Sequence, residues 1–393
     1  MGLANRITTF FGTRFDLDAG REFLDKQIHK RLPPHTSWLH VFASLSLLLF
    51  ISQTVTGILL LMYYRPTPEE AHASIKYITG EAHFGWLFRQ IHAWGASLMI
   101  LFVVLHMMRT FFAGAYKKPR ELTWITGTGL FVITIIFGFT GYLLPWNQVA
   151  FWATTVGTES ANKVPVIGSW LQYFLRGGDA VTGETLSRFF VVHVIILPWI
   201  LAGLVGVHLF LMRLNNLATL ERVGEEKPFP HQCGIPFYPV HVAKEGAVAV
   251  LLLAVLVTLS VVAPWGIGEP ADPLSTPEHI KPEWYFLPSY QLLKYFEGPY
   301  GAVVGILACS VPFILLIVWP FLDRGKERHP KKRPLAVGIG LLGAVAALFL
   351  GVLGHISETD QTFFGKRYHI DLLGRPHLID ENRSGEEVPG EHP

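Results

Sequence analysis

The sequence predicts an all-α protein, a polytopic membrane helical bundle with about seven transmembrane helices. Half of the 393 residues are hydrophobic and only 16% are charged, whereas a soluble domain usually carries about 25% charged residues. The apolar residues are gathered in long runs, several of which reach the roughly 20 residues that cross a bilayer as a helix. The net charge of +2 gives no indication of a nucleic-acid partner.

The chain divides into five segments in order. Residues 1–37 are polar and amphipathic, and residues 38–213 hold four apolar runs, at 38–64, 88–112, 124–145 and 189–213. Residues 214–245 form a polar linker. Residues 246–354 hold three further runs, at 246–264, 301–321 and 334–354, and residues 355–393 form a polar tail. Each run is long enough for one transmembrane helix.

Lysine and arginine residues predict the orientation of these spans. The side that holds the N-terminus carries 20 of them, and the loops on the opposite side carry 8. Because cytoplasmic loops are enriched in Lys and Arg, we expect a multi-pass protein of the inner (cytoplasmic) membrane with a cytoplasmic N-terminus. Seven spans then place the polar tail on the outer side.

Two long loops lie on the outer side, at 146–187 and 265–300, and both are rich in Pro, Trp and Tyr. Loops of this length in a compact protein are usually functional or disordered. Their aromatic composition favours an ordered chain at the membrane surface.

Four histidines lie inside the apolar runs. In the second run His106 follows His92 at position i+14, and in the fourth run His208 follows His193 at position i+15. At 1.5 Å per residue these separations are ~21 and ~22 Å, and each pair lies on roughly one helix face. The two runs cross the membrane in the same direction, so His92 is level with His193 near the outer side, and His106 with His208 near the cytoplasmic side. Two facing imidazoles at each of two depths predict two bis-histidine haem sites in a four-helix bundle.

Other interpretations of these residues are open. A single membrane histidine more often bonds a neighbouring helix, but four that match in depth are poorly explained that way. A zinc or proton-relay site would need its residues clustered. Arg89 and Arg109, each three residues from a histidine, could pair with haem propionates or simply extend toward the membrane surface. Glycine leaves room between helices, and the candidates are Gly57, Gly95, Gly127 and Gly141.

The segment Pro282–Phe286 reads PEWYF and lies in the second outer loop. An aromatic, partly dry pocket raises the pKa of a carboxylate, so Glu283 could exchange protons near neutral pH. Alone, the segment could equally be an aromatic membrane anchor with a solvated glutamate. Next to two haem sites, it favours a site for quinol.

About residues 25 to 355 resemble cytochrome b of the quinol-oxidising cytochrome bc complexes. The resemblance rests on the four histidines and on the stretches RLPPH, KKPRELTW, GYLLPWNQVAFW, PVIGSWLQYFLRG, SRFFVVHV and PEWYF. The histidine spacings, PVIGSW and the seven spans are closer to the photosynthetic type than to the mitochondrial type. The photosynthetic type is split into a four-span cytochrome and a three-span subunit. Here the two parts are fused, as a di-haem domain at 38–213 and a C-terminal domain at 246–354.

The resemblance implies a cytochrome b subunit of a quinol:cytochrome c oxidoreductase. Quinol would be oxidised on the outer side at Glu283, with Tyr142 and Tyr285 shaping the pocket. Electrons would pass through two non-covalent b haems to an inner quinone-reduction site, coupled to proton translocation. The implied partners are a Rieske iron–sulfur protein and a c-type cytochrome subunit, in a homodimeric complex.

The inner quinone site departs from the family pattern. Lys244 and Glu245 match the family's Lys-Asp pair, with Glu in place of Asp. The histidine of the mitochondrial type falls near Leu214 and is missing. His231 and His241 are nearby candidates for protonation.

The first span also departs from the pattern. Ala43 replaces the family's first glycine. Val41 replaces the cysteine that bonds an extra haem in the chloroplast type, and no C-x-x-C-H motif is present, so we expect no covalent haem.

Two other functions remain open from the sequence. A di-haem membrane anchor of a dehydrogenase or hydrogenase would leave PEWYF and the 146–187 loop unexplained. A haem-free transporter would show no b-haem absorbance after reduction with dithionite.

Overall fold

The computed structural model describes residues 2–225, 234–277, 280–298 and 300–379. Within these residues, seven helical segments are long and apolar enough to cross a membrane: Trp38–Leu61, Gly85–Phe112, Glu121–Leu143, Gly183–Asn215, Phe237–Val262, Gly301–Leu322 and Pro334–Ile356. The predicted membrane bundle is confirmed. The fourth and fifth helical segments begin well before the predicted apolar runs, because polar turns precede the apolar part of each helix.

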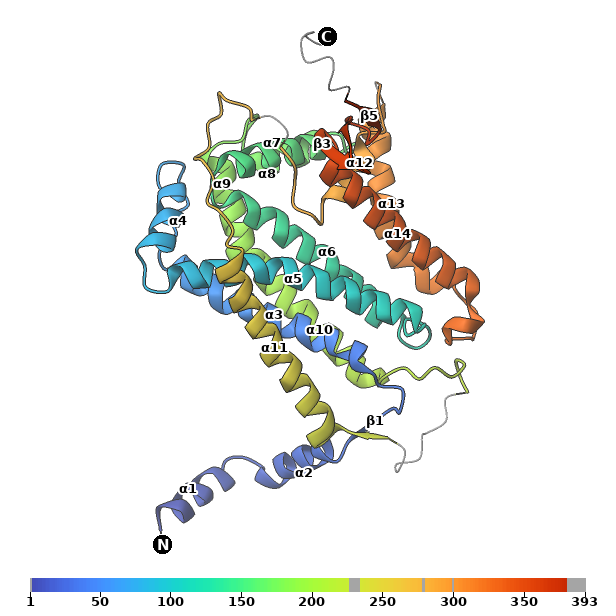
Figure 1. Ribbon diagram of the computed structural model, residues 1–393. Helices are drawn as coiled ribbons and strands as arrows, with labels where there is room; N and C mark the ends of the chain where they lie inside the picture. The colour runs from blue at the N-terminus through green and yellow to red at the C-terminus, as the bar shows by residue number, and fades with distance from the viewer. Residues whose placement is uncertain (1, 226–233, 278–279, 299, 380–393) are drawn as a thin grey trace.

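The N-terminal half contains four of the spans and the short helices that connect them (Figure 1). Helices α1 and α2 precede the first span, α4 connects the first two, and α7 and α8 fill the first long outer loop. Their bounds are α1 Leu3–Gly12, α2 Leu17–Ile28, α3 Val41–Leu61, α4 Ala71–Gly80, α5 Gly85–Phe112, α6 Glu121–Leu143, α7 Gln148–Asn162, α8 Gly168–Arg176, α9 Gly183–Val191 and α10 Leu197–Asn215. A 3₁₀ turn, η1 (Trp38–His40), opens the first span, and a π-helical turn, η2 (Val192–Ile196), joins α9 to α10.

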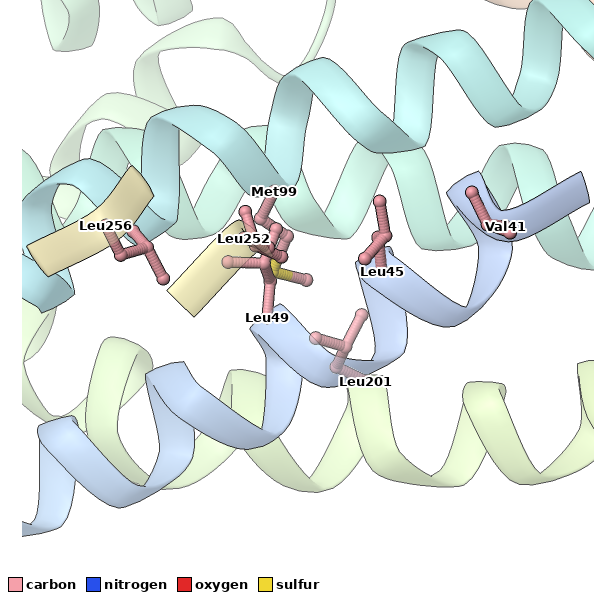
Figure 2. Close-up of a cluster of buried hydrophobic side chains, with 7 residues drawn as sticks. All are labelled: Val41, Leu45, Leu49, Met99, Leu201, Leu252 and Leu256. Atoms are coloured by element: carbon pink, nitrogen blue, oxygen red, sulfur yellow. The ribbon is translucent and has the colours of Figure 1, made fainter. Parts of the chain in front are cut away.

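One apolar core holds four spans together. Its residues come from four helices. They are Leu45 and Leu49 of α3, Met99 of α5, Leu201 of α10, and Leu252 and Leu256 of α11 (Val242–Val262). Figure 2 shows these side chains meeting between the helices. Val41, which replaces the chloroplast-type cysteine, is 5% exposed and belongs to the same core.

The three C-terminal spans flank the N-terminal bundle on two sides (Figure 1). Helix α11 packs against α3 and α5, whereas α13 (Gly301–Leu322) packs against α6 and α14 (Pro334–Ile356) packs against α5. The short helix α12 (Leu287–Leu293), which directly follows PEWYF, packs against both α13 and α14. The outer loop at 265–300 therefore connects helices on the two sides of the bundle.

Two small sheets lie outside the spans. Strands β1 (Arg31–Leu32) and β2 (Ile235–Pro236) pair antiparallel, just before α3 and just before α11. A second antiparallel sheet lies in the segment that the sequence predicted as a polar tail. It consists of β3 (Thr359–Phe363), β4 (Lys366–Ile370) and β5 (Pro376–Leu378). The first and last described elements, α1 and β5, lie at opposite ends of the bundle, as an odd number of spans requires (Figure 1).

Candidate haem and quinol sites

The outer pair of histidines faces across the bundle. The ring centres of His92, from α5, and His193, from η2, are 6.4 Å apart, and the ring planes make an angle of 71°. With a metal–nitrogen bond of about 2.0 Å and a ring centre about 1.2 Å behind each nitrogen, two imidazoles on opposite sides of one iron have centres about 6.4 Å apart. The separation of the two rings therefore fits a bis-histidine haem.

A threonine hydroxyl sets the protonation of His92. Thr56 Oγ1 donates its only proton to the carbonyl of Ser52, at 2.7 Å, and lies 2.9 Å from Nδ1 of His92. Since the hydroxyl can only accept from the ring, Nδ1 carries the imidazole proton. Nε2 is then free of a proton, as a metal ligand must be.

A threonine hydroxyl also lies near Nδ1 of two further histidines, each of which in addition forms a hydrogen bond with a backbone carbonyl, His193 with that of Phe137 and His208 with that of Thr123. Thr140 lies 3.1 Å from Nδ1 of His193, and Thr126 lies 3.1 Å from Nδ1 of His208. Each of these threonines donates its own proton to the carbonyl four residues earlier in α6, at 2.9 and 3.0 Å. Three of the four predicted ligands thus have a hydroxyl acceptor on the nitrogen that faces away from the metal position.

A glycine follows each of these threonines and makes room for the ring. A Cβ added to Gly141 would lie 2.6 Å from Cε1 of His193, and one added to Gly127 would lie 3.1 Å from Cε1 of His208. A Cβ on Gly57 would lie 3.4 Å from Cε1 of His92, an ordinary contact. These three glycines, predicted to make room for haem, make room for the imidazoles; Gly95 instead faces the side chain of Gln53. The threonines were missed in the sequence, where the signal is a repeated Thr-Gly dipeptide.

At the inner site, the sequence of α3 has no Thr-Gly pair at the position that would support His106. On α6, Thr140-Gly141 repeats Thr126-Gly127 at the same i+14 interval that separates His92 from His106. One such interval before Thr56-Gly57, on α3, the sequence has Phe42-Ala43 instead. His106 lies within electrostatic range of His208. The missing glycine noted at Ala43 is therefore accompanied by a missing hydroxyl.

The π-helical turn η2 explains the unequal histidine spacings. A π turn accommodates one more residue than an α turn, through i→i+5 hydrogen bonds. It begins directly before His193, and Pro198 follows at the start of α10, where it has no N–H to donate. The interval from His193 to His208 therefore spans nearly the same length and angle as the interval from His92 to His106, which is one residue shorter.

The two candidate propionate partners have protein partners of their own. Arg89 donates to the carbonyls of Trp265 and Gly266, at 2.9 and 2.6 Å, beyond the end of α11. Arg109 donates to Nε2 of His40 on the opposite side. Both arginines are half-buried near the ends of α5, each three residues from a histidine.

Backbone hydrogen bonds join the two long outer loops. Gln148 N donates to the carbonyl of Glu269 at 3.0 Å, and Ala271 N donates to that of Trp146 at 3.1 Å. The amide of Asn147 donates to the carbonyl of Ile267 at 2.7 Å. The start of α7 and the segment that leads to PEWYF therefore form one wall at the outer end of α6.

The PEWYF segment covers the outer end of α6. A Cβ added to Gly138 would lie 2.7 Å from the hydroxyl of Tyr285, so only glycine leaves room for this ring. The ring of Phe286 is 6.2 Å from that of Phe139. Glu283 and Tyr142 are close enough to interact electrostatically. The three predicted residues Glu283, Tyr285 and Tyr142 are thus brought together.

Burial changes the acidity of the groups in this loop. Glu283 is half-buried, and the loss of solvation raises the pKa of its carboxyl above the ordinary range. Burial also raises the pKa of the Tyr285 hydroxyl, and the charge of Glu283 adds to this effect. A carboxylate with a raised pKa beside two phenols accepts a proton at a higher pH than an ordinary glutamate does.

The inner candidates lie at the start of α11. Glu245 is 3.1 Å from Nε2 of His241, and Nζ of Lys244 lies over the ring of Trp38, 5.2 Å from its centre. The side chain of Leu214 is 61% exposed and takes no part. His231 lies outside the described residues.

Comparisons with known proteins agree with this geometry. A family profile described as "Cytochrome b/b6/petB" matches residues 27–216, and one described as "Cytochrome b(C-terminal)/b6/petD" matches residues 270–370. The chain is 43% identical over 321 residues to the "Cytochrome bc complex cytochrome b subunit" of Chlorobaculum thiosulfatiphilum, which covers 81% of this chain and 74% of that protein. It is 34% identical over 348 residues to the cytochrome b of Rhodobacter capsulatus, which covers 79% of each.

A solved structure titled "Hyperthermophilic respiratory Complex III" has the same fold. It matches with a TM-score of 0.80 and 34% identity, over 88% of this chain and 91% of the other. The haem b binding that the family implies fits the imidazole geometry above. The chain belongs to the cytochrome b family and is a quinol-oxidising cytochrome b subunit of the bc type, with both parts of the family in one polypeptide.

Proposed function

We propose that the chain holds two b haems, one between His92 and His193 and one between His106 and His208. The observation that carries this proposal is the Thr-Gly support at three of these imidazoles, which leaves Nε2 free to bind iron. Bound haems would carry one electron at a time between two depths of the membrane. Arg89 and Arg109, near the two ends of α5, would pair with haem propionates in place of their present protein partners.

Quinol oxidation would take place beneath the PEWYF segment. Glu283 accepts a proton from a quinol hydroxyl, and its raised pKa matches that task. Tyr285 and Tyr142 exclude water and orient the ring. Packing of Tyr285 against Gly138 holds the loop on α6, close to the His193 side of the bundle.

Quinone reduction would take place at the other end of the bundle. Lys244 and Glu245, in the first turn of α11, are the candidates to bind the quinone oxygen atoms and supply charge balance. The described residues of the linker and of the N-terminal segment, 2–37, 214–225 and 234–245, lie on this side.

The complete activity would be that of a quinol–cytochrome-c reductase coupled to proton translocation. The partners would be a Rieske iron–sulfur protein and a c-type cytochrome subunit, in a homodimeric complex of the inner membrane. The excess of Lys and Arg on the N-terminal side supports a cytoplasmic N-terminus. In this orientation Glu283 releases its proton outward, against the membrane potential.

The proposal is tested with the assembled complex. Dithionite should reveal two b haems, and quinol should reduce these haems and, through the iron–sulfur and c-type partners, cytochrome c. Replacing His208 with Leu should remove the inner haem and leave most of the outer haem. A di-haem dehydrogenase anchor would show both haems but no cytochrome c reduction by quinol, and equal loss of both haems from stable protein would contradict separate sites.

A further inference from the structure

Several histidines gather near the start of α11, on the side opposite PEWYF. The β1–β2 pairing brings residues 31–32 beside residues 235–236, and Phe237 N donates to the carbonyl of Lys30 at 2.9 Å. The segments that lead into α3 and α11 are therefore fixed side by side. His35 and His40 lie on the first segment, and His241 lies on the second.

The groups of this cluster act on one another. The rings of His35 and His40 have centres 6.1 Å apart, and His241 is within electrostatic range of His40. Nε2 of His241 is 3.1 Å from Oε1 of Glu245, one helical turn later. His241 is 9% exposed, so this pair is largely shielded from water.

The other members of the cluster cannot give a proton as readily. Arg109 donates to Nε2 of His40, and the backbone N–H of Ser37 donates to its Nδ1 at 3.0 Å. A cation in contact with one ring nitrogen opposes a second proton. Burial lowers the pKa of His35, and Arg109 lowers it further, against the opposing effects of the Ala218 carbonyl and Glu221. His241 has a carboxylate oxygen of Glu245 3.1 Å from its Nε2, and this contact fixes the orientation of the ring.

We infer that His241, paired with Glu245, is the proton donor of the inner quinone site. This inference rests on the proposed reduction of quinone there. It means that the imidazole comes from the start of α11 instead of from the end of α10, where Leu214 points outward. Trp38 and Lys244, stacked at 5.2 Å, and the Arg109–His40 pair are the other polar and aromatic groups around it.

The chemistry balances with these groups, electrons from the bundle and water on the cytoplasmic side. Quinone takes two electrons, one at a time, from the electron path of the bundle, and it takes two protons to form the two O–H bonds of quinol. With Glu245 ionised and bonded to Nε2–H, the imidazolium presents Nδ1–H as the donor for one quinone oxygen. Nδ1 is then reprotonated by water on the cytoplasmic side, and the second quinone oxygen takes its proton from the same water, so that two electrons and two protons form both O–H bonds.

A purely structural role is the alternative for the pair. Glu245 in the first turn of α11 also complements the helix dipole, and an i,i+4 pair adds slightly to helix stability. Such a role would affect stability but would not give the reaction a titrating group. The experiment must therefore measure pH dependence as well as rate.

The test uses the complex titrated with dithionite until its iron–sulfur and c-type centres and both b haems are reduced and no dithionite is left over. It is mixed with a short-chain quinone, and haem reoxidation is followed from pH 5 to 9. We expect His241→Gln to slow reoxidation by about 10²-fold or more and to abolish the pH dependence. Glu245→Gln should move that pH dependence to lower pH, because the imidazolium loses its carboxylate. His29→Gln, at an exposed histidine paired with Asp25, is the matched control and should behave as wild type.

Each outcome decides the matter. An unchanged rate and pH profile in His241→Gln would overturn the inference, as would loss of a haem from either variant or a normal profile in Glu245→Gln. If the prereduced wild-type complex does not pass electrons to quinone at all, the proposed inner site itself fails, whatever the variants do.

Discussion

The hydroxyl of Thr56 acts on a histidine 36 residues away in sequence. By accepting the Nδ1 proton, it leaves Nε2 as the ligand atom and makes the imidazole a stronger electron donor. Thr126 and Thr140 do the same for His208 and His193. The electron affinity of each haem site should therefore depend on residues that do not touch the metal position.

Thr56→Val keeps the shape of the side chain and removes the acceptor. We expect both haems to remain and the midpoint potential of the outer one to rise, because a weaker donor favours the reduced iron. A hydrogen bond contributes about 1 kcal/mol, and 59 mV corresponds to about 1.4 kcal/mol for one electron, so the rise should be about 40 mV. Thr54→Val, at an exposed threonine of the same helix, is the control for redox titration. Equal potentials in both variants would show that the hydroxyl has no such effect.

Glu283→Gln tests the proton acceptor of the outer site. The glutamine keeps the size of the side chain but cannot titrate, so quinol oxidation should slow by about 10²–10⁴-fold while the haem spectra stay normal. Because burial raises the pKa of Glu283, the wild-type rate should increase with pH through a range above that of an ordinary glutamate. That increase should be absent from the variant, as measured by steady-state quinol oxidation. Wild-type turnover across the pH range would make the carboxylate an anchor only.

At the scale of helices, η2 lets two unequal sequences present matched ligands. Deleting Ile195, a lipid-exposed residue of the π turn, shortens the His193–His208 spacing to that of α5. We expect the turn to become α-helical and both haems to be retained, as seen in the dithionite-reduced spectrum. Deleting Leu101 from α5 is the matched change. It rotates His106 by about 100° relative to His92, and one haem should be lost.

The sequence predicted the spans and the four histidines because hydropathy and residue spacing are local. It placed Glu283, Tyr285 and Tyr142 together only through the family resemblance, since contacts across loops leave no periodic signal. The role of η2 was not predictable, because i+14 and i+15 spacings both fit one helix face roughly. His35 and His40 were missed because β1–β2 pairing, not sequence distance, brings them to α11. The sheet at 359–378 was missed because its strands are short, polar and followed by a glycine turn.

At the scale of the whole molecule, the C-terminal spans must be held against a bundle that already has its own core. On the side opposite PEWYF, the carboxylate of Asp323, directly after α13, links α13 and α14 to the turn between α5 and α6. Its carboxylate is 2.7 Å from Nζ of Lys117 and 2.8 Å from Nη2 of Arg333, and it accepts the hydroxyl proton of Tyr116 at 2.6 Å. Trp319 donates to the Tyr116 hydroxyl at 2.7 Å. The network links the α5–α6 turn to both ends of the α13–α14 turn.

The pKa of Asp323 gives the pH dependence of this link. Burial alone would raise that pKa, but hydrogen bonds from Lys117 and Tyr116 and the charge of Arg333 outweigh it and hold the pKa below the ordinary value. A carboxyl with a lowered pKa in the folded state stabilises the fold above its unfolded pKa, which is about 3.9. This stabilisation is lost as the pH falls through the lower, folded value.

Asp323→Asn should therefore destabilise the join between the two parts of the chain. Removing one partner of a buried ion pair costs about 3–5 kcal/mol, because Lys117 and Arg333 remain with no carboxylate. At pH 7 the thermal unfolding midpoint of the complex should fall by several degrees, and protease should cut residues 324–333 faster, while the b-haem spectrum stays normal. The difference from wild type should shrink as the pH falls from the unfolded pKa of about 3.9 toward the lower, folded pKa at which the wild-type carboxylate protonates. Asp360→Asn, at a half-exposed carboxylate of β3, is the control, since exposed pairs contribute about 0–1 kcal/mol. Equal midpoints for Asp323→Asn and Asp360→Asn would mean that apolar packing alone holds α13 and α14 against the bundle.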